Sequence, residues 1–296
     1  MKTLFSRSNI ALAGMLIAGP VIAADYRAPN YAPPPIASPY SWTGFYFGGN
    51  VGYGLGKDNL TVSGFDVDGV AVPGTGFAAL KPTGVIGGLQ AGYNWQPAPN
   101  WVYGIESDFQ WSGQKDNVSA AGAVTSTSCF GDLNTPCSLT GTGSGSLAAK
   151  IDWLGTLRGR VGFAADDVLF YGTGGFAYGD VKTSSLGTFT GTFTDATTCS
   201  GGCPVSGSGL FSGSRTKLGW TVGAGIEGAL PYTTNWILRV EYLHVDLGTL
   251  SRSGAFTSSV SIPAIPLTQT TFGTATHSSR VTDEILRVAI SYKFGQ

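Results

Sequence analysis

A repeated alternation of apolar and polar side chains constrains the fold of this chain more than any other feature. It is clearest near the C-terminus, from Glu284 to Phe294. One parity there is apolar and the other is mostly polar: Leu286, Val288, Ile290, Tyr292 and Phe294 against Arg287, Ala289, Ser291 and Lys293. Successive side chains of a β-strand point to opposite faces, so this pattern predicts a strand with one apolar and one polar face.

Seven further stretches repeat the pattern, which predicts eight strands. Besides 284–294 they are 43–57, 83–96, 101–111, 147–163, 168–180, 217–230 and 236–247. Long Gly/Ser/Thr-rich connections (58–82, 112–146, 181–216 and 248–280) alternate with short turns (97–100, 164–167 and 231–235). Outer-membrane barrels show this alternation, with short periplasmic turns and longer extracellular loops. An even strand number places both chain ends on the periplasmic side.

The distribution of bulky residues indicates which face meets lipid. In 101–111, Trp101, Ile105 and Trp111 share one parity, while Glu106 and Asp108 share the other. A soluble sandwich would bury the bulky residues and expose the charges, whereas a transmembrane barrel turns aromatics to lipid and polar groups inward. The expected fold is therefore an all-β, eight-stranded antiparallel transmembrane β-barrel. The sequence does not reveal the lipid face of 168–180, and a parity shift at 243–247 predicts a bulge.

The N-terminal residues predict export. Lys2 and Arg7 precede a short apolar run at 10–18 and a small-residue cleavage site after Ala23 or Ala24, as in a secretory signal peptide over 1–24. A Pro-rich periplasmic segment (25–42) then leads into the barrel (43–296). Only 12% of the residues are charged and the net charge is −1, which argues against nucleic acid as a partner. The predicted location is the outer membrane of a Gram-negative bacterium.

Ten charged residues fall on the predicted interior parity. They are Glu106, Asp108, Lys150, Asp152, Arg158, Arg160, Glu227, Arg239, Glu241 and Arg287. Both signs occur, and unpaired buried charges are costly, so these groups should pair. They would form either an ion-pair plug or a gated ion path. An eight-stranded barrel is only wide enough for side chains, which favours the plug.

Aromatic residues gather beside the predicted short turns and should form the periplasmic girdle of the barrel. They are Trp95, Trp101, Phe163, Trp236, Tyr292 and Phe294. Four cysteines lie in predicted extracellular loops: Cys129, Cys137, Cys199 and Cys203. Disulfides are expected in an oxidising compartment, either within each loop (129–137 and 199–203) or between the two loops.

No catalytic residue, cofactor or metal site is predicted. The pair His277–Ser278 hints at a hydrolase, but it lies in a predicted Gly/Thr-rich loop without a rigid base and orienting acid. The cysteines have no histidine nearby to complete a metal site. The Gly-rich run 52–56 precedes no helix, so it is not a nucleotide fingerprint.

Several strand motifs carry a family resemblance. They are W-T-G-F-Y-F-G-G-N-V-G-Y-G (42–54), L-F-Y-G-T-G-G-F-A-Y-G (169–179), W-T-V-G-A-G-I-E (220–227), W-I-L-R-V-E-Y-L (236–243) and the closing Y-K-F (292–294). From residue 42 onward the chain resembles the small outer-membrane β-barrel proteins of alphaproteobacteria, which are similar in fold to the membrane domain of OmpA and to opacity-type adhesins. Members commonly end at the terminal Phe, whereas here Gly295 and Gln296 follow Phe294.

The resemblance implies a structural, surface-exposed protein that supports envelope integrity and displays its loops outside. The alternatives are a narrow porin for small solutes, loop-mediated capture of haem or a host protein as an adhesin would, and a lipid-modifying enzyme. The expected partners are the lipid bilayer, lipopolysaccharide and, during insertion, the barrel-assembly machinery. The expected form is a monomer.

Overall fold

The computed structural model describes residues 40–67, 70–126, 137–195, 199–231, 233, 235–262 and 267–295. The predicted signal peptide and most of the Pro-rich segment lie outside the described residues, as does Cys129. Every described residue belongs to one compact unit, Pro39–Gln296. None of the described residues forms a helix long and apolar enough to cross a membrane.

Ten antiparallel strands make up the described part of the chain. They are β1 (Gly44–Val67), β2 (Val70–Leu80), β3 (Thr83–Ala98), β4 (Trp101–Ser112), β5 (Lys115–Ser126), β6 (Cys137–Ala165), β7 (Val168–Asp195), β8 (Cys203–Ala229), β9 (Trp236–Ile262) and β10 (Leu267–Lys293).

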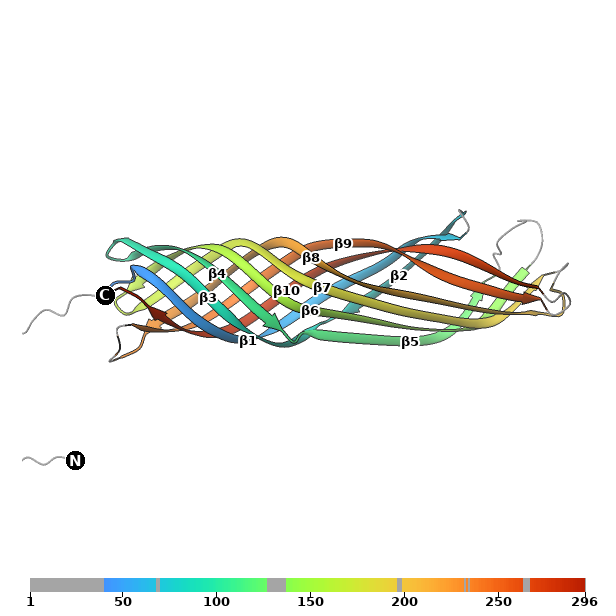
Figure 1. Cartoon of the computed structure of the whole chain (residues 1–296), viewed down its shortest axis with the longest axis horizontal. Coiled ribbons are helices and arrows are strands. Elements are labelled where there is room, and N and C mark those ends of the chain that lie inside the picture. The colour runs from blue at the N-terminus through green and yellow to red at the C-terminus, as the bar shows by residue number, and fades with distance from the viewer. Residues whose placement is uncertain are drawn as a thin grey trace, which may run out of the picture. The chain divides into compact units, whose positions relative to one another are not determined.

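Eight of these strands close into a ring. β1 pairs with β10 on one side and with β3 on the other, and the ring continues through β4, β6, β7, β8 and β9 back to β10 (Figure 1). β2 pairs only with β1, and β5 pairs mainly with β6, beyond the ends of β3 and β4. The predicted eight-stranded antiparallel barrel is confirmed.

The ring strands continue far into the segments expected to be long loops. β1 reaches Val67, β7 reaches Asp195 and β9 reaches Ile262, so each long connection is largely a two-stranded extension of the barrel. These segments are rich in Gly, Ser and Thr on both faces, so no apolar alternation marks them as strands. The three predicted short turns all lie at the opposite end, after β3, β6 and β8.

Two local ambiguities of the sequence are resolved. On β7, Phe170 and Phe176 are exposed, whereas Leu169 and Ala177 are buried, which identifies the outer face of this strand. The bulge predicted from the parity shift at 243–247 lies at the C-terminal end of that range.

On β9, Leu243, Val245 and Leu247 stay buried on the same parity as Glu241. The bulge consists of Leu247 and Gly248: Asp246 pairs with Thr282 and Thr249 with Arg280, so these two residues of β9 oppose one residue of β10. Gly248, with a φ of 72°, supplies the left-handed conformation of this bulge.

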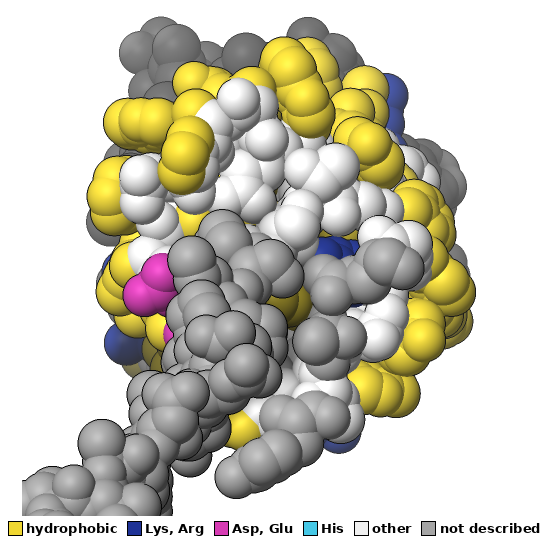
Figure 2. Space-filling model, turned by 90° about the vertical axis from the view of Figure 1, so that its left-hand side faces the viewer, with side chains coloured by type: hydrophobic (Ala, Val, Ile, Leu, Met, Phe, Trp, Pro, Cys, Tyr) yellow, Lys and Arg dark blue, Asp and Glu magenta, His cyan; other side chains and the backbone are white. Residues whose placement is uncertain are grey.

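The outer surface carries the apolar belt expected of a bilayer-spanning barrel. All six predicted girdle aromatics are exposed on it, including Trp101 and Phe163, whose ring centroids lie 6.1 Å apart. Trp236 and Tyr292 lie 5.3 Å apart on the neighbouring strands β9 and β10. Figure 2 views the barrel from the end that carries the short turns and shows hydrophobic side chains around much of its rim.

Candidate functional site

Eight charged side chains fill the middle of the barrel. Each is at most 6% exposed, and four arginines face four carboxylates, so the cluster is neutral. The members are Glu106 and Asp108 of β4, Arg158 and Arg160 of β6, Glu227 of β8, Arg239 and Glu241 of β9, and Arg287 of β10. We call these eight residues the lumen network.

Direct cross-strand pairing places opposite charges side by side in the lumen network. Glu106 lies opposite Arg158, Glu227 opposite Arg239, and Glu241 opposite Arg287. Opposite-charge pairs across an antiparallel sheet are stabilising. The strand register itself therefore assembles three of the ion pairs.

One half of the lumen network is organised around Arg158 and Arg287. The Arg158 guanidinium contacts Glu106, Asp108 at 2.9 Å and Glu241 at 3.0 Å. Arg287 reaches the same Asp108 oxygen at 2.9 Å and Glu241 at 2.5 Å. Each arginine thus bridges several strands across the lumen. Hydrogen bonds between ionised groups of this kind are stronger than hydrogen bonds between neutral groups.

The other half joins Arg160 and Arg239 through Glu227, with each N–O distance 2.6 Å. Arg239 also contacts Glu106 at 2.6 Å, so Glu106 links the two halves. Two interior tyrosines complete this region. Tyr46 donates to Glu106 at 2.5 Å, and the Tyr171 ring lies 3.9 Å from the Arg160 guanidinium carbon.

Lys150 and Asp152 do not join the lumen network, which corrects the sequence prediction. The β6–β7 register shifts between Ile151 and Trp153, so the parity inferred from Arg158 and Arg160 is inverted beyond that point. Ile151 is buried inside, whereas the Lys150 side chain is 51% exposed on the outer surface.

An apolar layer lies on the periplasmic side of the lumen network. Its centre is Trp42, which is fully buried and packs among residues of β4, β6, β7 and β9. Its indole N–H donates to the Asp166 carbonyl at 3.3 Å, and its backbone N–H donates to Gln96 at 2.8 Å. Lys293 is also fully buried here, and its ammonium lies 4.4 Å from the Tyr40 ring centroid. The segment before β1 therefore packs inside this end of the barrel.

A second apolar layer lies towards the extracellular end. Ten buried residues from β3, β6, β7, β9 and β10 form one cluster: Ile86, Ile151, Leu154, Ala177, Val181, Leu243, Val245, Leu247, Val281 and Ile285. The sequence did not predict either apolar layer, because interior positions were expected to be small or polar. Parity alone would have found Tyr46, Tyr171 and Lys293, which share the inward register of the charged groups.

Comparison with known proteins fits this architecture. Residues 18–294 match the family described as outer membrane protein beta-barrel domain. This chain belongs to that family. A 31 kDa outer-membrane immunogenic protein of Brucella melitensis is 38% identical over 213 residues, which are 71% of this chain and 72% of that protein. A 22 kDa outer membrane protein of Rhizobium leguminosarum bv. viciae is 32% identical over 207 residues, or 70% of this chain and 64% of that protein.

Solved outer-membrane barrels also align with this family member. OprG of Pseudomonas aeruginosa aligns with a TM-score of 0.36 and 11% identity, covering 86% of this chain and 97% of that one. Ail, the attachment invasion locus protein of Yersinia pestis, aligns with a TM-score of 0.28 and 13% identity, covering 81% and 99%. The family and its curated relatives place this barrel in the outer membrane of a Gram-negative bacterium.

Cys199, Cys203 and His244 of this outer-membrane barrel are not part of the lumen network. Cys199, in the connection after β7, forms a disulfide with Cys203, the first residue of β8, whereas Cys129 and the side chain of Cys137 lie outside the described part. His244 lies on the outer surface, with its Nδ1 atom 2.9 Å from Glu284. His277 lies within β10 rather than in the expected loop. No metal-binding group of His, Cys, Asp or Glu occurs among the described residues.

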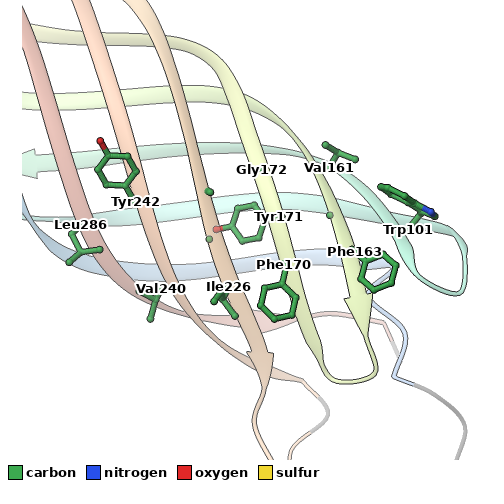
Figure 3. A pocket seen from close by; sticks show the side chains of 13 residues that line it. Trp101, Val161, Phe163, Phe170, Tyr171, Gly172, Ile226, Val240, Tyr242 and Leu286 are labelled. Carbon is green, nitrogen blue, oxygen red and sulfur yellow. The ribbon is translucent and has the colours of Figure 1, made fainter.

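A groove of about 570 Å³ runs over the outer face of this barrel near β7, β8 and β9 (Figure 3). Phe170, Ile226 and Val240 line it, together with the small residues Gly172 and Ala224. A substrate pocket usually combines apolar walls with a few convergent polar groups. This groove is almost entirely apolar and lies within the lipid-facing belt, so it is part of the membrane surface.

Proposed function

We propose that this protein is a structural outer-membrane barrel with a closed lumen, which supports the envelope and displays four extended hairpins outside the cell. The observation that carries the proposal is the filled interior. A neutral, mutually paired lumen network lies between two apolar layers centred on Trp42 and on Leu243. Such an interior makes the barrel a rigid anchor.

The same interior disfavours the narrow-porin alternative. A conducting path would have to pass both apolar layers and separate ion pairs such as Arg158–Glu241. Removing one partner of a buried ion pair leaves an uncompensated charge and is strongly unfavourable. The lumen charges therefore act on one another rather than on a solute, and the proposal includes no catalytic step.

Loop-mediated binding of a ligand or host surface is the second candidate, and the hairpins favour it. The extensions of β6 and β7 belong to neighbouring hairpins, and hydroxyl pairs join them. The Oγ atom of Ser138 lies 2.6 Å from the Thr194 Oγ1 atom, and that of Ser144 lies 2.8 Å from the Thr188 Oγ1 atom. Such ladders hold the extensions as ordered strands that present hydroxyl-rich surfaces. The Brucella melitensis relative is named an immunogenic protein, which is consistent with surface display of this kind.

Trimming one hairpin separates envelope support from surface binding. Ser184 and Ser212 lie directly opposite each other on β7 and β8, above the ring. Replacing the residues between them with Asn-Gly, a favoured two-residue hairpin turn, should leave a folded barrel. The trimmed protein should still show a mobility difference between boiled and unboiled samples on a gel.

The functional test is complementation of a deletion strain, scored by survival in detergent. The full-length and trimmed proteins should restore resistance equally, because the closed barrel provides the support. If the trimmed barrel folds but fails to restore resistance, the hairpins carry the function and the proposal is wrong.

A further inference from the structure

Three lysines form a row across the outer surface of neighbouring strands. Lys115 of β5 lies directly opposite Lys150 of β6, and Lys150 lies directly opposite Lys182 of β7. Directly opposed residues share one face of the sheet, with Cβ atoms roughly 5 Å apart. All three residues are exposed, and the side chains of Lys150 and Lys182 are each 51% exposed.

Like charges in direct cross-strand register destabilise a sheet, so this lysine row needs a counter-charge. Asp152, the bulge residue of β6, supplies part of it: its carboxylate contacts the Lys150 ammonium at 2.5 Å and also pairs with Lys182. Hydrogen bonds from Lys150 and then Lys182 hold the pKa of Asp152 below its usual range, so it is ionised. Asp180, two residues before Lys182 on the same face of β7, also interacts with the Lys182 ammonium. Three ammoniums and two carboxylates leave the row with a net charge of +1.

The lysine row begins where the aromatic belt ends. On β4, β6 and β7 the outward aromatics furthest from the periplasmic turns are Trp111, Trp153 and Tyr178, and Lys115, Lys150 and Lys182 follow beyond them. The Phe109 and Trp153 rings stack with their centroids 5.6 Å apart, and the Trp153 and Tyr178 ring centroids lie 6.1 Å apart. These three residues form a continuous aromatic cluster. Aromatic girdles mark the two membrane–water interfaces of such barrels. The lysines therefore lie at the level of the outer-leaflet headgroups.

We propose that Lys115, Lys150 and Lys182 bind a phosphate group of lipopolysaccharide, the phosphorylated glycolipid of the outer leaflet. A phosphate monoester carries about −1.5 to −2 charge at neutral pH and three acceptor oxygens, so it opposes the positive charge of the row and offers one acceptor oxygen to each ammonium. The aromatic cluster below packs against the acyl chains. This inference deepens the proposed envelope role, because it names the lipid that the barrel engages.

Native mass spectrometry of the detergent-solubilised barrel, titrated with bisphosphorylated lipid A, tests the site. Lys150→Gln/Lys182→Gln should weaken binding about tenfold or more, the loss expected when charge-assisted hydrogen bonds are removed. Dephosphorylated lipid A should bind the wild type as weakly as it binds this variant. Lys150→Arg/Lys182→Arg keeps the charge and should retain affinity.

Two further variants separate binding from folding. Lys57→Gln removes an outward lysine of β1 that has Thr282 rather than a lysine opposite it, so it should not change affinity. Asp152→Asn raises the net charge of the row and should strengthen lipid A binding, whereas a purely structural ion pair predicts no gain. A heat-modifiable Lys150→Gln/Lys182→Gln variant with wild-type affinity, or weaker binding by Asp152→Asn, would overturn the proposal. Either outcome leaves the closed-lumen proposal intact, because lipid A binding on the outer surface does not report on whether the lumen conducts ions.

Discussion

Single interior residues of this barrel connect several strands at once, and Glu106 does so most widely. It contacts Arg158 and Arg239, which lie in different halves of the lumen network, and accepts a hydrogen bond from Tyr46. Removing its charge would leave the network with an excess positive charge in a site that is 2% exposed. The cost of such a change should therefore be large compared with any surface substitution.

Glu106→Gln should lower the free energy of unfolding by about 3–5 kcal/mol, because it breaks buried ion pairs and leaves arginine charge uncompensated. Urea titration of the refolded barrel, followed by its boiled and unboiled gel forms, measures this. Glu284→Gln is the matched control, since that carboxylate pairs with His244 on the outer surface. It should cost no more than about 1 kcal/mol. Equal effects of the two substitutions would show that the lumen network is not a stabilising plug.

Parity in the sequence correctly placed the eight residues of the lumen network inside. It failed at Lys150 and Asp152 because a bulge inverts the register, and a bulge of one residue leaves no compositional mark in the sequence. Which arginine meets which carboxylate also depends on strand register. Register is set jointly by the hydrophobic patterns of the paired strands and by turn geometry, so it cannot be derived from one strand alone.

Neighbouring strands approach closely where a glycine lies opposite an interior arginine. Gly175 of β7 lies opposite Arg158, and a Cβ atom there would meet the Leu157 carbonyl oxygen at 2.1 Å and the Arg158 Cα at 2.7 Å. Both contacts are with backbone, so the strands would have to separate. At Gly174, on the outer face, the nearest atom would be the Thr221 carbonyl oxygen at 3.5 Å, an ordinary contact.

Gly175→Ala should therefore destabilise the barrel by about 1–3 kcal/mol, as overpacking generally does. Gly174→Ala should be neutral or stabilising by about 0.4–1 kcal/mol, because alanine restricts the unfolded chain. The measurement is the urea midpoint of each variant under identical refolding conditions. A Gly174→Ala variant less stable than Gly175→Ala would contradict the strand packing described here.

The extensions beyond the ring show the limit of strand prediction from sequence. β7 and β8 continue as Gly/Ser/Thr-rich strands to a disulfide between Cys199 and Cys203. Neither face of these segments is continuously apolar, so period-two alternation gave no signal there. Pairing of these two extensions depends on the ring parts of β7 and β8, which already hold the two strands side by side in register. The short turns were predictable because Pro97 and Pro99, for example, interrupt the aromatic pattern sharply.

The barrel as a whole has two apolar surfaces. One is the outer belt that faces lipid, and the other is the pair of internal layers around Trp42 and Leu243. The neutral lumen network lies between these layers, which exclude water from its ion pairs and so strengthen them. The closure that we propose for the lumen would thus be a property of the complete interior and not of one constricting residue.

Single-channel recording in planar bilayers tests this closure most directly. The barrel, refolded until the unboiled gel form predominates, should insert without resolvable conductance steps across the usual voltage range. A known general porin reconstituted in parallel shows that the bilayer reports open channels. Reproducible steps from the wild type that disappear in Arg158→Gln/Arg160→Gln would contradict the closed lumen and identify the charged interior as an ion path.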